Sequence, residues 1–230
     1  TRSALDCALV LDAIRGEDNK DLTVQNHPFN YTGKADLSKL KIGYLKDYFD
    51  GGRGSQKIND SISLEVLKSL GATLEPVEWV SDMPFGAMQA ILTAEASAAF
   101  DALTRSDQDT LLVRQNAGAW PNLFRAARFT SAVDYINANR ARYELVEKVN
   151  ALMKEYDVIV TPSFGGSQLL TTNLTGHPCV VLKNGYNNQG SPTSISFIGN
   201  LFDEATILSV ARTYQEATDF DEQHPPKFLN

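Results

Sequence analysis

Hydroxyl and amide side chains are dense between residues 161 and 177. A nearly all-apolar segment, Asp157–Thr161, leads into a Ser/Gly/Thr-rich loop at Pro162–Thr172, and a second loop leads into the apolar run Pro178–Leu182. Loops at the strand ends of α/β sheets often bind ligands, because backbone donors converge there and glycines allow close approach. The segment therefore indicates either a ligand site or an ordinary turn region whose polar residues cap the strand ends.

Local motifs of the common enzyme classes are missing from the sequence. His27, His177 and His224 have no short-range partners, and neither HExxH nor CxxC occurs, so no metal site is predicted. No GxGxxG follows a strand and no GxxxxGK occurs, so no nucleotide or other cofactor is predicted. The GxSxG nucleophile elbow is absent too, which argues against catalysis by a common local motif.

The composition is that of a folded, acidic protein. Of 230 residues, 43% are hydrophobic and 21% are charged, with a net charge of −7. Because the chain has no concentrated Lys/Arg tract, neither nucleic acid nor an anionic membrane is expected as a partner. The best apolar run, Ala4–Ile14, is too short for a membrane span and predicts a core helix. Cys7 and Cys179 are interpreted as buried free thiols, and a cytoplasmic location is expected.

Hydrophobic periodicity predicts the elements that must position the two loops. Helical spacing predicts five helices. The first begins after Ser3, and the other four cover residues 58–70, 84–105, 131–156 and 202–218. Short apolar runs predict five strands, at 41–45, 72–77, 157–161, 178–182 and 193–198.

The order of these elements indicates how the sheet is assembled. Residues 41–77 form a predicted β–loop–α–β unit with two parallel strands, whereas the Asn/Gly-rich connection 184–190 predicts a hairpin. The strand 157–161 is apolar on both faces and is expected inside the sheet. The predicted fold class is α/β, with a mixed, largely parallel β-sheet covered by helices, in a single domain over residues 1–230.

Six short patterns occur along the chain in a consistent order. They are R-S-x-x-D-x-A from Arg2, K-I-G-Y-L at 41–45, L-G-A at 70–72, the helix around Arg128, D-V-I-V-T-P at 157–162, and N-L-T-G-H-P at 173–178 followed by P-T-S-I-S-F-I-G-N at 192–200. Together they resemble the C-terminal part of the amidase signature family. The resemblance covers nearly the whole chain and implies a partial amidase-signature fold.

The resemblance also implies what this chain lacks. The family hydrolyses amides with a Ser–cis-Ser–Lys triad, in which a neutral Lys relays protons and backbone N–H groups hold the oxyanion. Both the Lys segment and the Gly/Ser-rich run are expected before Thr1, so no catalytic residue is assigned here. Gly165-Gly166-Ser167 is no substitute, because no suitable Lys accompanies it. Since the chain opens at Thr1 without an initiator Met, it is expected to be cut from a longer protein.

What remains for this chain is one wall of the substrate cleft. The residues predicted to bind substrate are Thr161, Ser163, Gln168 and Asn173, with Arg128 as a candidate anion contact. In the glutamine-using amidotransferase A subunits, an Arg and an Asp hold the amino acid.

Arg125 or Arg128 would fill the first of these roles, but Gly166 or Ser167 stands at the Asp position. A glutamine ammonium would then lack its counter-charge, which favours a general amidase. Both arginines remain open to a surface or ion-paired role, and His177 is interpreted as a structural hydrogen-bonder rather than a general base.

The sequence therefore predicts the C-terminal portion of an amide hydrolase that acts on a small carboxamide. The alternative is a stand-alone, non-catalytic ligand-binding or interaction module that reuses half of the fold. The expected partners are a small amide substrate and either the missing N-terminal amidase segment or a second copy of the chain. Half of a fold should leave a sheet edge and apolar surface uncovered.

Overall fold

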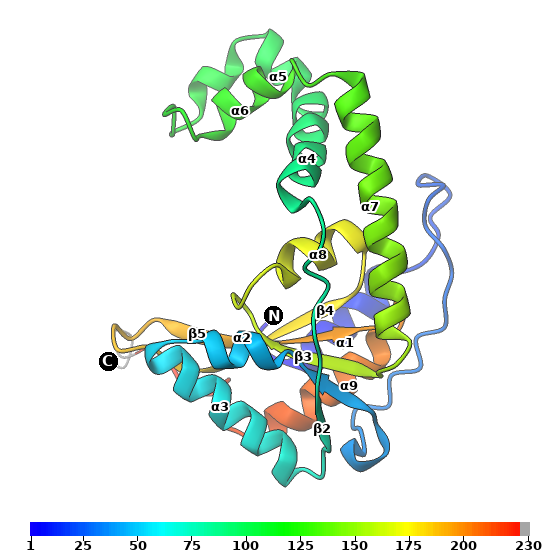
Figure 1. Cartoon of the computed structure of the whole chain (residues 1–230), viewed down its shortest axis with the longest axis vertical. Coiled ribbons are helices and arrows are strands. Elements are labelled where there is room, and N and C mark those ends of the chain that lie inside the picture. Colours follow the sequence, from blue (N-terminus) through cyan, green and yellow to red (C-terminus); the bar gives the residue numbers. More distant parts are fainter. Residues whose placement is uncertain (226–230) are drawn as a thin grey trace. The chain divides into compact units, whose positions relative to one another are not determined.

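Within residues 1–225, which the computed structural model describes, the chain folds into two units, and a five-stranded sheet organises the first (Figure 1). This unit comprises Thr1–Trp79 and the chain from Val149 onward, and the second comprises Val80–Lys148. The sheet has the order β2-β1-β3-β5-β4. Its strands are β1 (Ile42–Tyr44), β2 (Leu74–Pro76), β3 (Val158–Pro162), β4 (Cys179–Tyr186) and β5 (Pro192–Gly199).

Strand pairing confirms a mixed sheet. β1 runs parallel to both β2 and β3, as the predicted β–loop–α–β unit requires, whereas β5 runs antiparallel to both β3 and β4. The expected hairpin is the β4–β5 pair, which carries a register shift between Lys183 and Gly185. β3 lies in the middle of the sheet and all five of its residues are buried, which explains why its sequence is apolar on both faces.

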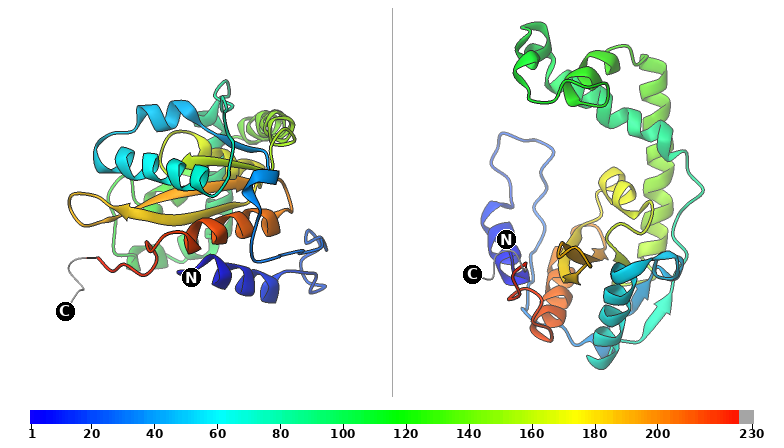
Figure 2. Two further views of the ribbon diagram at one scale, coloured as in Figure 1. Left: turned by 90° about the horizontal axis from the view of Figure 1, so that it is seen from below. Right: turned by 90° about the vertical axis from the view of Figure 1, so that its left-hand side faces the viewer.

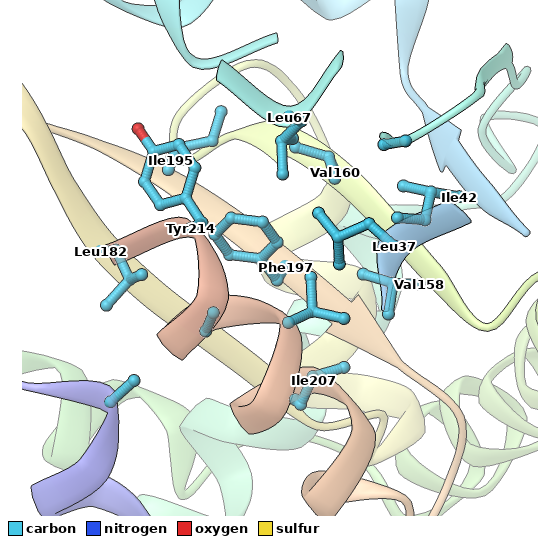
Figure 3. Packing of buried hydrophobic residues seen from close by; sticks show 14 of the residues in the cluster. Leu37, Ile42, Leu67, Val158, Val160, Leu182, Ile195, Phe197, Ile207 and Tyr214 are labelled. Atoms are coloured by element: carbon cyan, nitrogen blue, oxygen red, sulfur yellow. The ribbon is translucent and has the colours of Figure 1, made fainter. Parts of the chain in front are cut away.

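The two faces of the sheet are covered differently (Figures 1 and 2). Helices α3 (Gly54–Ser69) and α9 (Glu204–Glu216) lie on one side, here called the core face, and α8 (Gln168–Thr175) lies on the other. Figure 3 shows the core face, whose strand residues pack against Leu67 of α3 and Ile207 and Tyr214 of α9. The strand residues of this cluster are Ile42, Val158, Val160, Leu182, Ile195 and Phe197.

The opposite side of β3, β5 and β4 is here called the pocket face. In register across it lie Thr161, Ser196 and Val181, one from each strand. Ser194 shares this face, because it is two residues from Ser196 on the same strand. Alternation along β5 therefore sends Ile195 and Phe197 to the core face, and Ser194, Ser196 and Ile198 to the pocket face.

Three further elements complete the first unit. They are α1 (Ala4–Ile14), α2 (Lys46–Gly51) and the short 3-10 helix η1 (Leu37–Lys39). The Ser3 side chain caps α1 by accepting a hydrogen bond from the Asp6 N–H, as its position before the apolar run suggests. The expectation that α1 is a core helix is wrong, because only Ala4 and Ala8 are buried. Leu9 and Ile14 are 61% and 74% exposed.

The second unit contains helices and the segments that connect them, and no strand is assigned between Val80 and Lys148. Its elements are α4 (Phe85–Ala99), α5 (Asp101–Arg105), η2 (Gln108–Leu111), α6 (Trp120–Ala127) and α7 (Ala132–Met153), the last of which continues past Lys148. The helices expected over 84–105 and 131–156 are present, the first interrupted at Phe100. Phe124 of α6 stacks on Phe100 with ring centroids 4.8 Å apart. A single domain over residues 1–230 stays a prediction, since the sheet belongs to the first unit alone.

Candidate functional site

A pocket of about 410 Å³ opens on the pocket face of the first unit. The β3–α8 turn, helix α8 and strands β4 and β5 line it together. Its polar lining consists of Ser163, Gln168, Thr172, Asn173, His177, Ser194 and Ser196, and its remaining lining of Phe164, Leu169, Cys179, Val181 and Ile198. No Asp, Glu, Lys or Arg side chain is among these residues, so the pocket is uncharged when His177 is neutral.

Three of the five predicted substrate-binding residues meet in this pocket. Ser163, Gln168 and Asn173 all line it, although they come from the turn and from both ends of α8. Thr161 lies on the same face but is fully buried, and its hydroxyl donates to the Pro162 carbonyl at 3.2 Å. Asn173 is exposed and donates from Nδ2 to the Leu169 carbonyl at 2.7 Å.

Arg128, the fifth predicted residue, belongs to the second unit. There it forms an ion pair with Asp101 and lines a separate cavity of about 620 Å³. Arg125 pairs at 2.6 Å with Asp109, whose side chain is fully buried, so its visible role is to neutralise a buried carboxylate. The ion-paired alternative therefore describes both arginines, and a role for Arg128 as an anion contact stays a prediction.

The tight turn after β3 is held by Tyr48, a residue that sequence reasoning did not single out. Its ring lies so close to the turn that a Cβ added at Gly166 would stand 2.4 Å from the Tyr48 Cζ, so a larger residue there would have to displace the ring. The Tyr48 hydroxyl accepts from the Ser167 N–H at 3.3 Å and lies 3.2 Å from Ser167 Oγ. Tyr48 therefore fixes where α8 begins.

The loop expected over Pro162–Thr172 is partly wrong, because α8 occupies its second half. Its Ser- and Thr-rich sequence is typical of loops, since short hydroxyl side chains compete for backbone hydrogen bonds. In the structure these hydroxyls bond within the helix instead. Thr171 Oγ1 donates to the Ser167 carbonyl and Thr175 Oγ1 to the Thr171 carbonyl, both at 2.9 Å.

Gln168 is the first residue of α8 and is 2% exposed. Its Nε2 donates to the Pro162 and Ser163 carbonyls, each at 2.9 Å, and so ties the helix start to the end of β3. Its Oε1 is buried and accepts no hydrogen bond from the described residues. Gln168 thus has a free acceptor beside the pocket, and its role in binding substrate stays a prediction.

His177 is 3% exposed and bonds through Nδ1 to Thr175 Oγ1 at 2.8 Å. This is the structural hydrogen bond that its interpretation as a hydrogen-bonder requires. Its Nε2, however, is buried without a partner among the described residues. Burial lowers the pKa of the imidazole below its ordinary value, which favours the neutral ring.

The thiol and hydroxyls of the pocket lie near one another. Ser163 Oγ is 2.8 Å from Ser196 Oγ. Both cysteines are free, but the expectation that they are buried is wrong, since Cys7 is half-buried and Cys179 is exposed at the pocket. Desolvation raises the pKa of the Cys179 thiol, and a hydrogen bond to Ser196 partly offsets this.

The described residues offer neither a nucleophile–base pair nor a metal centre at this pocket. Within residues 1–225, no serine hydroxyl is hydrogen-bonded to a lysine side chain, and no group of three or more His, Cys, Asp or Glu side chains could hold a metal ion. No helix in the same range has the length and apolarity needed to cross a membrane. The arrangement can bind and orient a neutral polar molecule.

Comparisons with known proteins agree with this picture. The Amidase family model matches residues 1–170. The glutamyl-tRNA(Gln) amidotransferase A subunit of Oceanobacillus iheyensis is 31% identical, over 98% of this chain and 55% of the relative. The equivalent protein of Lysinibacillus sphaericus is 30% identical with equal coverage. The chain thus spans about half the length of the curated relatives that it matches.

Solved structures share the fold at lower identity. A bacterial aryl acylamidase of the amidase signature enzymes family superposes with a TM-score of 0.78 at 16% identity, over 98% of this chain and 55% of that one. A peptide amidase in complex with chymostatin gives a TM-score of 0.77 at 21% identity, over 99% of this chain and 54% of that one. The partial amidase-signature fold expected from the motifs is confirmed.

Proposed function

From the premise that the chain belongs to the Amidase family, we propose that it is the C-terminal portion of an amide hydrolase acting on a small carboxamide. It supplies one wall of the substrate cleft, and the Ser–cis-Ser–Lys triad lies outside this chain. The observation that carries the proposal is the uncharged pocket in which Ser163, Gln168 and Asn173 meet.

The lining of the pocket supports a neutral amide as the substrate. Hydroxyl, amide and imidazole groups offer hydrogen bonds without formal charge, and Phe164, Leu169 and Val181 supply exposed apolar surface beside them. Phe164 is 86% exposed, so it is free to cover an apolar substrate body. A zwitterionic amino acid such as glutamine would find no counter-charge in this lining. The lining therefore favours a general amidase over a tRNA amidotransferase.

Uncovered apolar surface supports a macromolecular partner for this chain. Leu9 and Ile14 of α1 and Val181 of the edge strand β4 are all more than half exposed. Exposed apolar residues beside an unpaired strand edge are typical of a surface that another segment covers. We propose the remaining part of an amidase, or otherwise a second copy of this chain, as that segment, in a cytoplasmic protein.

Binding and turnover by the purified chain test the proposal. We expect the chain alone to bind benzamide, detected by saturation-transfer NMR, without hydrolysing it. Asn173→Ala should weaken this binding, whereas Asn137→Ala, at an exposed position of α7 in the second unit, should not. Amide hydrolysis that persists at constant specific activity through purification would overturn the assignment of the triad to another segment.

The coding sequence upstream of Thr1 provides the second test. An open frame with a lysine segment and a Gly/Ser-rich run is expected, and joining it to this chain should produce hydrolysis of the amides that the chain binds. If a start codon lies directly upstream and the chain still binds amides, the stand-alone binding module is the correct interpretation.

A further inference from the structure

Two buried hydrogen-bond acceptors without partners belong to residues of the same pocket. They are Gln168 Oε1 and His177 Nε2, and both residues are at least 97% buried. Buried polar atoms are nearly always hydrogen-bonded, because an unpaired one loses its contact with water and gains nothing in exchange. Two such atoms on one pocket indicate a missing partner.

The orientation of Gln168 is fixed by its own amide nitrogen. Both hydrogens of Nε2 are used, one on the Pro162 carbonyl and one on the Ser163 carbonyl. Reversing the amide would place Oε1 against these two carbonyl oxygens, and the three acceptors would repel one another. The group left unpaired is therefore the carbonyl oxygen, which can only accept.

Two hydrogen bonds in sequence favour one tautomer of His177. The Thr175 hydroxyl has one proton, and it donates this proton to the Thr171 carbonyl at 2.9 Å. With that bond in place the hydroxyl accepts from His177 Nδ1, which lies 2.8 Å away and then carries the ring proton. In the neutral imidazole Nε2 then has a lone pair and no hydrogen, so it too can only accept.

Two fixed acceptors require donors on the ligand. We infer that the pocket recognises the N–H side of its ligand and selects an uncharged primary amide, whose NH2 group presents two donors. The inference rests on the proposed function, because it concerns the same cleft wall. It makes Gln168 and His177 a pair of specificity-determining residues, of which sequence reasoning identified only Gln168 as a substrate contact.

The same geometry rejects related ligands. A tertiary amide has no N–H to donate, and a carboxylate would bring negative charge toward two lone pairs. A cation could donate, but no acidic side chain lines the pocket to balance its charge. Both acceptor atoms are buried, so a donor bonded to them is shielded from bulk water, and hydrogen bonds are stronger in such an environment.

Three ligands that share a benzene ring distinguish a primary amide from a tertiary amide and from a carboxylate. We expect the intact chain to bind benzamide at least tenfold more tightly than N,N-dimethylbenzamide or benzoate in titrations followed by NMR. Equal affinity for all three would overturn the inference while leaving the proposed function standing. Failure of all three to bind would overturn both.

Variants assign the preference to the acceptors. His177→Phe removes one acceptor and should reduce the preference for benzamide over its dimethyl analogue several-fold. Asn137→Ala, at an exposed position of the second unit, should leave the preference unchanged. A preference that survives His177→Phe intact, or falls equally in Asn137→Ala, would count against the assigned pair.

Two measurements on the unaltered chain keep the inference testable if His177→Phe does not fold. Imidazole ¹⁵N spectra should show His177 protonated at Nδ1 and bare at Nε2, and the reverse tautomer would overturn the inference. Benzamide should slow alkylation of Cys179 by N-ethylmaleimide, since this thiol lines the pocket, but not that of Cys7, which lies outside it. Equal protection of both thiols, or of neither, would place the ligand elsewhere.

Discussion

The two faces of the β-sheet differ in burial and polarity, although the same strands form both. On the core face, Ile195 and Phe197 of β5 are fully buried, and the Phe197 ring lies 5.6 Å from that of Tyr214. On the pocket face, Ser194 and Ser196 of the same strand line an open pocket beside Cys179. The covering helices account for part of the difference, because α9 has 13 residues and α8 has only eight.

The comparison shows what each kind of environment does to a polar group. On the core face, burial raises the pKa of Tyr214 to about 12, yet its hydroxyl lies 2.9 Å from Ser63 Oγ and is satisfied. On the pocket face, Gln168 and His177 each keep one buried atom unpaired. Asn184 Oδ1, in the same network as Ser63, is also buried without a partner, so the contrast is between the paired Tyr214 hydroxyl and the two unpaired atoms beside the pocket.

Replacing one side chain on each face should give the largest contrast. Phe197→Ala leaves a cavity against Tyr214 and should lower the free energy of unfolding by about 3–5 kcal/mol. Ser196→Ala, at the preceding residue, should cost only about 1 kcal/mol, because it removes a hydroxyl and its contacts with Ser163 and Cys179 but leaves no large cavity. Urea denaturation measures both, and similar losses would mean that the two faces are equally packed.

The turn into α8 should tolerate change less well than an open glycine elsewhere. In Gly166→Ala the new Cβ overlaps the Tyr48 ring, so we expect a loss of about 1–3 kcal/mol and weaker ligand binding. Gly86→Ala is the matched control in α4, where nothing lies within 4 Å of the added Cβ, and it should cause no loss. Thermal unfolding and benzamide titration together report the difference.

The hydroxyl pair of the pocket face offers a smaller test. Ser163→Ala and Ser196→Ala each break the same 2.8 Å contact, so the double variant should cost less than the sum of the single losses. We expect a coupling energy of about 0.5–1.5 kcal/mol from the double-mutant cycle. Strict additivity would show that the two hydroxyls do not interact.

The effect of pH on the free energy of unfolding should be the smallest of these effects, and its sign should be opposite for His177 and for Asp60. Burial lowers the pKa of His177, so the unfolded imidazole takes up its proton first as pH falls below about 6.5, and the free energy of unfolding decreases. Burial raises the pKa of Asp60, although hydrogen bonds from Asn184 and Gln56 oppose the rise. The unfolded carboxyl therefore loses its proton first as pH rises above about 3.8. The free energy of unfolding then decreases with rising pH.

Conservative variants separate the two slopes. His177→Asn keeps an amide donor for Thr175 and should remove the loss of stability below about pH 6.5. Asp60→Asn keeps the acceptor for Asn184 and should remove the loss on the alkaline side of about pH 3.8. The measurement is the midpoint of urea unfolding at pH values from roughly 3.5 to 7.5, the range set by these two groups. If either variant kept the pH dependence of the parent chain, the assignment of that slope to the replaced residue would be wrong.

Much of the fold followed from the sequence, because strand burial leaves a local pattern. The all-apolar run of β3 placed it inside the sheet, and the Asn/Gly-rich connection after β4 indicated the hairpin. Helix α8 escaped prediction, since its Thr-rich sequence resembles a loop until its hydroxyls are seen bonding to the preceding turn. The exposure of Leu9 also contradicted its pattern, because helical spacing shows which residues share a side and not whether anything covers it.

The sequence by itself determined the family, the mixed α/β class and three residues of the pocket, since residue type and order along the chain carry that information. Only the tertiary structure decided the rest. It brought Tyr48 against Gly166, paired Arg128 with Asp101, and set the directions in which Gln168 and His177 can hydrogen-bond. These depend on contacts between residues distant in sequence and on the use of individual protons, and a linear pattern records neither.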